Sequence, residues 1–237
     1  MNTITLERTV GELVTERPGR SRVFEKYGID YCCGGKRPLA EACKKKGVSL
    51  EDLVQELERS DASATESEPS CDSMTLTELV NHIIVTHHAY LAAELPRLRR
   101  MAERVAKVHG DRERRLVTLD QAVGELSREL ESHIAKEERI LFPFIQLLEQ
   151  SPTLPYLPFG TLANPIRAME SEHDIAGNGL ETIRQLTDGY APPNWACNTY
   201  RALFDGLREL ELDLHQHIHK ENNILFPKSM ELEKSRG

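Results

Sequence analysis

The stretch HIHKENNILFP, residues 217–227, repeats a stretch that lies 84 residues earlier, HIAKEERILFP, residues 133–143. Eight of the eleven positions are identical, and each copy places a histidine four residues before a glutamate. Residues four apart lie on the same face of an α-helix, and here that face also carries apolar residues of an expected core. Packing alone does not call for histidine and glutamate at core positions. The repeat therefore predicts two equivalent helices that bind a cation.

The composition of the 237-residue chain favours a helical protein, because aromatic residues make up only 5%. A net charge of −8 argues against nucleic acid or an anionic membrane as a partner. No window approaches eighteen apolar residues, and the N-terminus lacks the apolar segment of a signal peptide. We therefore expect a cytoplasmic protein that spans no membrane. Five cysteines, an odd number in a reducing compartment, argue against a disulfide framework.

The chain is expected to be all-α and to have two helical parts. Residues 60–73, SDASATESEPSCDS, are small, polar or acidic, so they have little to bury and predict a flexible linker. Residues 1–59 contain short helical patterns and form an expected small domain. Residues 74–237 contain long amphipathic patterns, which begin near positions 75, 112, 164 and 194. Four such helices with modest connections indicate a four-helix bundle.

Histidine interrupts the apolar face of all four long helices, and glutamate interrupts two of them as well. A carboxylate in a bundle core needs a cation or a large pKa shift. Six inward side chains are more than one tetrahedral zinc ion uses, whereas imidazoles with bridging carboxylates suit two iron ions. The sequence thus predicts a di-iron centre in which the two glutamates bridge and open positions accept a small ligand. The expected ligands are His88, His133, Glu137, His173, His217 and Glu221.

Other polar residues fit this pattern less well. His109 lies twenty-one residues beyond His88, about 31 Å along an unbroken helix, so we expect a structural role at the end of the bundle. Glu129 lies one turn before His133 and either orients that imidazole or faces water. The remaining histidines of the bundle lie away from the centre of the stripes: His82, His87, His215 and His219.

The second unusual stretch is YGIDYCCGGKRP, residues 27–38. Two glycines after Cys32 and Cys33 suggest an exposed loop tip, and Lys36 and Arg37 would lower the pKa of a thiol there. Reversible thiol chemistry or soft-metal binding competes with a plain structural role for these cysteines. A 14-residue flexible linker has an end-to-end spread of about 20 Å. The thiol pair could therefore reach the mouth of the bundle and act with the metal centre.

DYCCGG near the N-terminus, followed by HIxKExxILFP twice, resembles the RIC family, the di-iron proteins for repair of iron centres. The resemblance covers nearly the whole chain, and its C-terminal part is hemerythrin-like. It implies a bacterial cytoplasmic protein that restores iron–sulfur clusters damaged by nitric oxide or peroxide. It also implies the six ligands named above, two bound iron ions, and a functional cysteine pair at Cys32 and Cys33. The family commonly has a histidine where His109 falls.

Three functions remain open at this stage. The first is repair by iron donation to damaged iron–sulfur proteins or apo-cluster acceptors, which requires no enzymatic turnover. The second is an enzyme that reduces nitric oxide to nitrous oxide at two ferrous ions. The third is a hemerythrin-like sensor or carrier of oxygen or nitric oxide, although storage alone would not need the thiols. The sequence does not identify the acceptor, and it leaves open whether the chain forms a homodimer.

Overall fold

The computed structural model describes residues 4–5, 7–63 and 71–237 of the chain. In these residues the regular structure is helical, apart from one isolated β-bridge between Thr9 and Pro38. The all-α class expected from the composition is therefore confirmed. The chain divides into two compact units. The first comprises Met1–Val80, Ile145–Tyr156 and His215–Gly237, and the second comprises Asn81–Phe144 and Leu157–Leu214.

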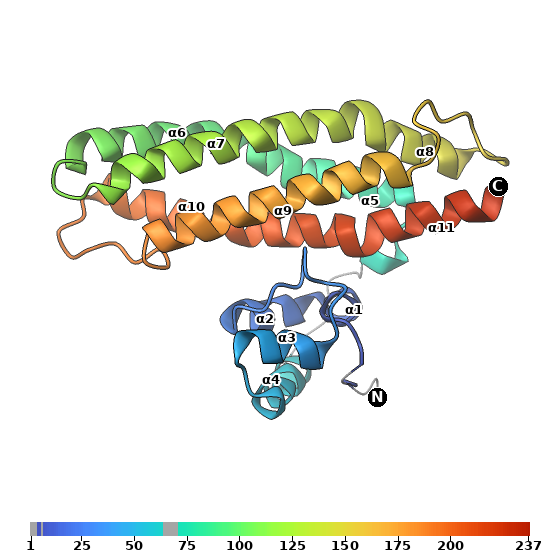
Figure 1. Cartoon of the computed structure of the whole chain (residues 1–237), viewed down its shortest axis with the longest axis horizontal. Coiled ribbons are helices and arrows are strands. Elements are labelled where there is room, and N and C mark those ends of the chain that lie inside the picture. Colours follow the sequence, from blue (N-terminus) through green and yellow to red (C-terminus); the bar gives the residue numbers. More distant parts are fainter. Residues whose placement is uncertain (1–3, 6, 64–70) are drawn as a thin grey trace. The chain divides into compact units, whose positions relative to one another are not determined.

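Short helices at the start of the chain enclose a core of their own (Figure 1). They are α1 (Val10–Glu16), η1 (Pro18–Arg20), α2 (Ser21–Lys26), α3 (Leu39–Lys46) and α4 (Leu50–Ser63). Helix α1 begins at a capping box, in which the Glu12 N–H donates to Thr9 Oγ1 and the Thr9 N–H donates to the Glu12 carboxylate. Helix α3 ends at Gly47, whose φ of 67° favours glycine. The N-terminal residues therefore form a small helical domain, as expected.

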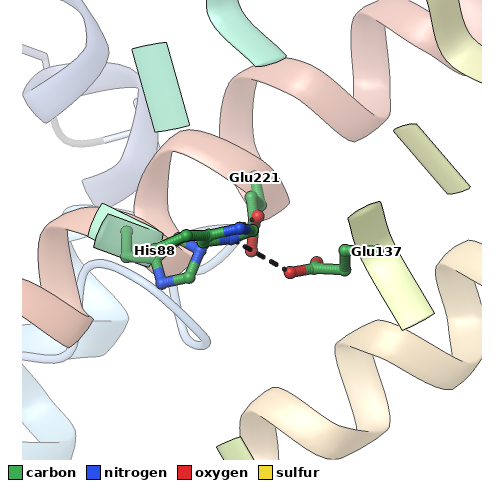
Figure 2. A group of neighbouring side chains, drawn as sticks. His88, Glu137 and Glu221 are labelled. Carbon is green, nitrogen blue, oxygen red and sulfur yellow. Dashed lines mark hydrogen bonds and ion pairs between the residues drawn. The ribbon is translucent and has the colours of Figure 1, made fainter. Parts of the chain in front are cut away.

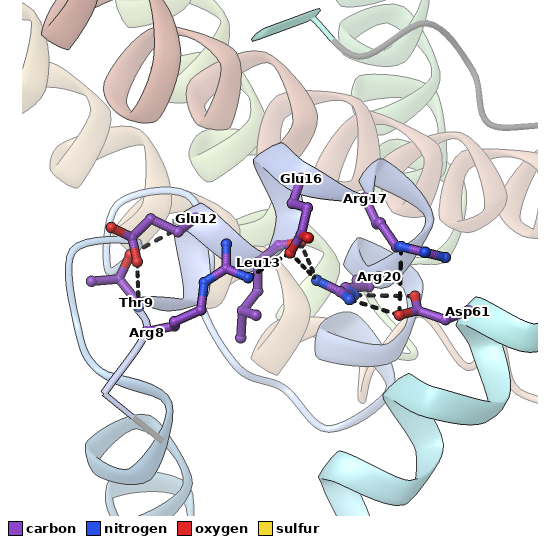
Figure 3. A network of polar contacts seen from close by, with 8 residues as sticks. All are labelled: Arg8, Thr9, Glu12, Leu13, Glu16, Arg17, Arg20 and Asp61. Carbon is purple, nitrogen blue, oxygen red and sulfur yellow. Dashed lines mark hydrogen bonds and ion pairs between the residues drawn. The ribbon is translucent and has the colours of Figure 1, made fainter. Parts of the chain in front are cut away.

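A buried arginine ties this small domain together (Figure 3). Arg20 is only 1% exposed, and its guanidinium donates to both carboxylate oxygens of Asp61, at 3.1 and 2.6 Å. It also donates to Glu16 Oε2 at 2.9 Å and to the Leu13 carbonyl at 3.1 Å. Two carboxylates and one carbonyl satisfy the buried charge, so its desolvation is offset. The arginine thereby connects helix α1 with the end of helix α4.

The second unit is a bundle of long helices that lie side by side (Figure 1). The helices are α6 (Ala89–His109), α7 (Arg115–Lys136), α9 (Ala163–Leu186) and the part of α10 (Asn198–Lys220) up to Leu214. Each contributes leucines to one buried core, for example Leu95, Leu119, Leu180 and Leu207. The amphipathic patterns of the sequence therefore predicted the bundle correctly, since each apolar stripe faces this shared core.

In the described part of the chain, three helices are interrupted by a π-helical turn. These turns are η3 (Ile84–His88) between α5 (Leu76–Ile83) and α6, η4 (Glu137–Leu141) between α7 and α8 (Phe142–Gln150), and η5 (Glu221–Leu225) between α10 and α11 (Phe226–Arg236). A π turn adds a residue and shifts the register of the side chains that follow. Ile140 lies three residues after Glu137, where an α-helical register would direct it toward the core, but it is 47% exposed. Ile224, at the equivalent position of η5, is 3% exposed, so the π turn alone does not decide this burial.

The predicted linker overlaps two described segments. Helix α4 continues to Ser63, and Cys71–Ser73 form the 3-10 turn η2. Residues 64–70 lie outside the described residues, so a flexible linker stays a prediction. Glu149 of α8 then caps the start of α5 by accepting from the Leu76 and Thr77 N–H groups at 2.7 and 2.9 Å. None of the described helices has the length and apolar character needed to cross a membrane.

Candidate metal centre

The six predicted metal ligands are buried, and three of them lie in a π turn. Glu137 and Glu221 are the first residues of η4 and η5 and are each 0% exposed. His88 is the last residue of η3, and His173 lies within α9. His133 and His217 stand one turn before the two glutamates, on α7 and α10. π turns often occur at functional sites, because they redirect side chains that a regular helix would hold apart.

Within the second unit, Glu137 faces two different histidines. Its Oε1 lies 3.3 Å from His133 Nε2, and its Oε2 lies 3.4 Å from His88 Nε2. The Nε2 atoms of His133 and His173 are 3.0 Å apart. A carboxylate that bridges two metal ions would need to direct one oxygen toward the ligands of each ion. Glu137 has this arrangement, because its two oxygens point to separate imidazoles.

The other copy of the repeat supplies the matching pair of ligands. His217 Nε2 lies 3.1 Å from Glu221 Oε1. Two groups of side chains bring ligand atoms within 4.8 Å of one another, and both groups contain Glu137 and Glu221. Figure 2 shows the His88 imidazole and these two carboxylates directed toward one another. The first group adds His88 and His217, and the second adds His133 and His173.

Carboxylates outside the ligand set hold two of the imidazoles. His88 Nδ1 lies 2.8 Å from Glu138 Oε1, and His133 Nδ1 lies 3.0 Å from Glu172 Oε2. A carboxylate accepts hydrogen bonds, so each Nδ1 donates its proton there, and the neutral imidazole would offer its Nε2 lone pair to a metal ion. Glu172 also pairs with Lys136 at 2.5 Å. Burial raises the pKa of Glu172, but its bonds to Lys136 and His133 outweigh that and keep the pKa below its ordinary value.

The donor set fits two cations. Two buried carboxylates carry negative charge that burial penalises, and converging imidazole lone pairs repel one another unless a cation lies between them. Neutral imidazoles with shared carboxylates suit iron rather than a structural zinc site, which is closed by four ligands. Each of the two groups would hold one ion through its two imidazoles, with both glutamates shared.

The sequence patterns did not predict the two carboxylate partners, Glu138 and Glu172. Glu129 is exposed, whereas Glu172 of α9 is the residue that bonds His133. Glu138 and Glu172 each stand next to a ligand in the sequence, immediately after Glu137 and immediately before His173. Their position beside a predicted ligand was the available signal that these glutamates belong to the site. The signal is weak, because adjacent residues on one helix point in different directions and need not share a site.

Histidines outside the ligand set have other partners. His109 Nε2 lies 3.2 Å from Cys197 Sγ, and its ring packs against Trp195, which agrees with a role at the end of the bundle. His87 is buried and its Nδ1 lies 2.8 Å from Asp213 Oδ1. His219 is buried too, and desolvation lowers its pKa to about 4.

The cysteine loop differs from the expected exposed tip. Cys32 is buried, and its thiol donates to Asp30 Oδ1 at 3.3 Å, while Cys33 Sγ lies 4.0 Å away. The hydrogen bond with Cys33, burial and the Asp30 carboxylate together raise the pKa of Cys32 well above its ordinary value. Lys36 and Arg37 therefore do not dominate the electrostatics of this thiol. Asp30 wraps the loop by also accepting from the Cys32 and Gly34 N–H groups.

Known proteins share both parts of this architecture. The model of the hemerythrin HHE cation binding domain matches residues 79–229, and a domain of unknown function, ScdA_N, matches residues 6–61. The iron-sulfur cluster repair protein YtfE of Escherichia coli O157:H7 is 40% identical over 224 residues, which cover 94% of this chain and 97% of that protein. The protein of the same name from Shigella boydii serotype 4 (strain Sb227) is 39% identical with the same coverage.

The chain belongs to the family of these iron–sulfur cluster repair proteins. Its long helices form the hemerythrin-like bundle of the family, and the small N-terminal domain precedes them. The resemblance inferred from DYCCGG and the duplicated segment is confirmed. The hemerythrin-like domain and the buried cluster of histidines and glutamates suit a di-iron centre.

Proposed function

We propose that this chain is a cytoplasmic di-iron protein that repairs iron–sulfur clusters damaged by oxidative or nitrosative stress, and that it does so by donating iron. The observation that carries the proposal is the pair of ligand groups that share Glu137 and Glu221. Membership in a family whose relatives are named iron–sulfur cluster repair proteins supplies the target. The partners would be apo-cluster or damaged-cluster proteins.

The ligand chemistry favours release. Imidazole nitrogen and carboxylate oxygen hold ferrous iron less tightly than thiolates do, and they lose it when they are protonated. Glu138 and Glu172 orient His88 and His133 so that their Nε2 lone pairs face the metal positions. These orienting contacts lie at the surface of the helices. The Glu138 carboxylate is exposed, and Glu172 pairs with the exposed Lys136 ammonium. An acceptor could therefore reach them from outside.

Transfer can be measured directly. The iron-loaded ferrous protein would be incubated without oxygen with an apo iron–sulfur enzyme, and recovered acceptor activity would be followed with a chelator-only sample in parallel. Donation predicts that iron reaches the acceptor faster than it reaches buffer. Glu137→Ala should abolish the transfer, while Glu129→Gln, an exposed glutamate on the same helix, should leave it unchanged. If iron moves to the acceptor no faster than to buffer, direct donation is excluded.

A second candidate is reduction of nitric oxide to nitrous oxide. Two ligand groups that share both carboxylates would hold two metal ions close together, so each could bind one nitric oxide and supply one electron. This function predicts repeated turnover with a reductant and nitrous oxide as the product. Reversible binding of nitric oxide or oxygen, with neither iron loss nor nitrous oxide, would instead indicate a sensor.

Cys32 and Cys33 are proposed as the functional thiols of the small domain. The burial and the raised pKa of Cys32 argue that the loop must open before this thiol reacts quickly, whereas Cys33 is half-buried. A Cys32→Ala/Cys33→Ala variant in the transfer assay would show whether the pair contributes. Equal transfer by the variant and the parent protein would assign the thiols a purely structural role.

A further inference from the structure

Asn223 lies two residues after Glu221 in the π turn η5, and its side chain bonds the cysteine loop. The Asn223 Nδ2 donates to the Cys32 carbonyl at 3.0 Å and to the Tyr31 carbonyl at 3.3 Å. These residues belong to the same compact unit of the chain. A side-chain amide that spans two consecutive carbonyls fixes the backbone just before the thiol pair.

Two glycines form a socket for this amide. A Cβ atom added at Gly11 would lie 2.6 Å from Asn223 Oδ1, and one added at Gly35 would lie closer still. The Gly11 N–H donates to the Gly35 carbonyl at 2.8 Å, so helix α1 and the cysteine loop together build the socket. Neither position has room for a side chain while Asn223 occupies it.

The residues around the socket are packed rather than loosely apposed. The Tyr31 ring meets the buried His219 ring edge-on, with 5.6 Å between centroids. His219 Nδ1 lies 3.3 Å from Asn223 Nδ2, and His219 Nε2 lies 3.4 Å from Thr15 Oγ1. The small domain thus contacts the helix that carries Glu221 through a buried and hydrogen-bonded patch.

The other copy of the repeat lacks this contact. The positions equivalent to His219 and Asn223 are Ala135 and Arg139, and Arg139 is exposed. Binding a metal through the repeat therefore does not require an asparagine at this position. The asparagine serves the contact with the cysteine loop.

We propose that Asn223 is a positioning residue that couples the Cys32–Cys33 loop to the metal centre. It fixes the loop onto the same π turn that begins at Glu221, so occupation of the thiols shifts the turn and changes the environment of that carboxylate. This coupling rests on the proposed function, in which Glu221 binds metal. The class of molecule that would use it is a thiol-binding ligand that engages both sulfurs.

The loop-fixing part of the proposal needs no metal to be tested. In Asn223→Ala, Cys32 should be alkylated by iodoacetamide about tenfold faster than in the parent protein, the factor expected when the two hydrogen bonds are lost. Arg139→Ala, at the equivalent position of the other copy, should alkylate at the parent rate. Gly11→Ala displaces the amide without changing residue 223 and should match Asn223→Ala. Far-UV circular dichroism would verify that each variant is folded.

The coupling is tested with phenylarsine oxide on iron-loaded, full-length protein kept without oxygen. Its arsenic bonds both sulfurs and releases one water, so the reagent occupies the pair without oxidising it. The absorption spectrum of the iron centre should change in the parent protein and in Arg139→Ala. It should not change in Asn223→Ala, Gly11→Ala or the double cysteine variant. Iron content measured beforehand separates a failed metal assignment from a failed coupling.

Two results would overturn the proposal. One is an unchanged absorption spectrum of the parent protein, although mass spectrometry shows that phenylarsine oxide is bound to it. The other is a folded Asn223→Ala protein whose spectrum still responds as the parent does. A protein that binds no iron would remove the proposed function and this coupling together.

Discussion

The two copies of the duplicated segment are alike where they face the metal site and differ where they face the rest of the chain. Both begin a π turn with a fully buried glutamate, Glu137 in η4 and Glu221 in η5. Both place a histidine four residues earlier, with Nε2–carboxylate distances of 3.3 and 3.1 Å. The histidine and glutamate positions are therefore the part of the segment that coordination chemistry constrains.

The remaining positions of the two copies make different contacts. In the first copy, Glu138 bonds His88 Nδ1, and Ile140 is 47% exposed. In the second copy, the equivalent Asn222 and Ile224 are buried, and Asn223 contacts the cysteine loop. The two copies thus make different contacts: the first bonds a proposed metal-binding histidine, and the second contacts the small domain.

The largest expected effect concerns what the copies share. Glu137→Ala and Glu221→Ala should each weaken metal binding by more than about a hundredfold. Loss of a residue that only hydrogen-bonds a metal ligand already lowers metal affinity about ten- to hundredfold. Iron content after gel filtration measures the loss. Glu129→Gln should retain the parent iron content. If one glutamate proves dispensable, the two copies do not contribute equally to the centre.

The next effect concerns packing. Ile224 is 3% exposed and Ile140 is 47% exposed, although they occupy the same position of the repeat. Ile224→Ala should cost about 2–4 kcal/mol in the free energy of unfolding of the metal-free protein. Ile140→Ala should cost less than about 1 kcal/mol. Urea denaturation of both variants makes the comparison, and equal losses would contradict the difference in burial.

Exchanging residues between the copies tests their division of labour. Glu138→Asn removes the carboxylate from His88 and should weaken metal binding about tenfold. Asn222→Glu places a carboxylate at a position that is 6% exposed, so it should destabilise the fold by about 1–3 kcal/mol. Metal titration and thermal unfolding of each variant separate the two effects. The account fails if Glu138→Asn binds metal as the parent protein does.

The smallest effect is expected for Arg139→Asn, which places the asparagine of the second copy at the equivalent position of the first copy. Arg139 is exposed, so the substitution should change the unfolding free energy by no more than about 0.5 kcal/mol. Iron content should also stay the same. A clear loss in either measurement would show that the first copy makes a contact that its exposure does not indicate.

The spacing of the apolar residues and the cost of burying charged ones predicted the helical bundle and the candidate metal ligands. Leucine stripes predicted the helices of the bundle, because each helix must bury one face. The cost of burying Glu137 and Glu221 pointed to a cation. The π turns were missed, because an α-helical template cannot detect an added residue.

Contacts distant in sequence were also beyond reach. Asn223 meets Cys32 across 191 residues, and Glu172 meets His133 across 39. The loop around Cys32 was expected to be exposed, but Asp30 folds it inward by accepting three hydrogen bonds. This contact is local, since Asp side chains commonly accept from the backbone N–H groups that follow them, so the signal for it was present in DYCCGG.

The central claim is that the two copies jointly hold a pair of iron ions through shared glutamates. Mössbauer spectroscopy with metal analysis, on protein purified without oxygen and loaded with iron-57, tests it most directly. The account predicts about two iron ions per chain, one for each ligand group, in a magnetically coupled pair that disappears in Glu221→Ala. A single uncoupled iron, no iron, or a coupled pair that survives Glu221→Ala would contradict it.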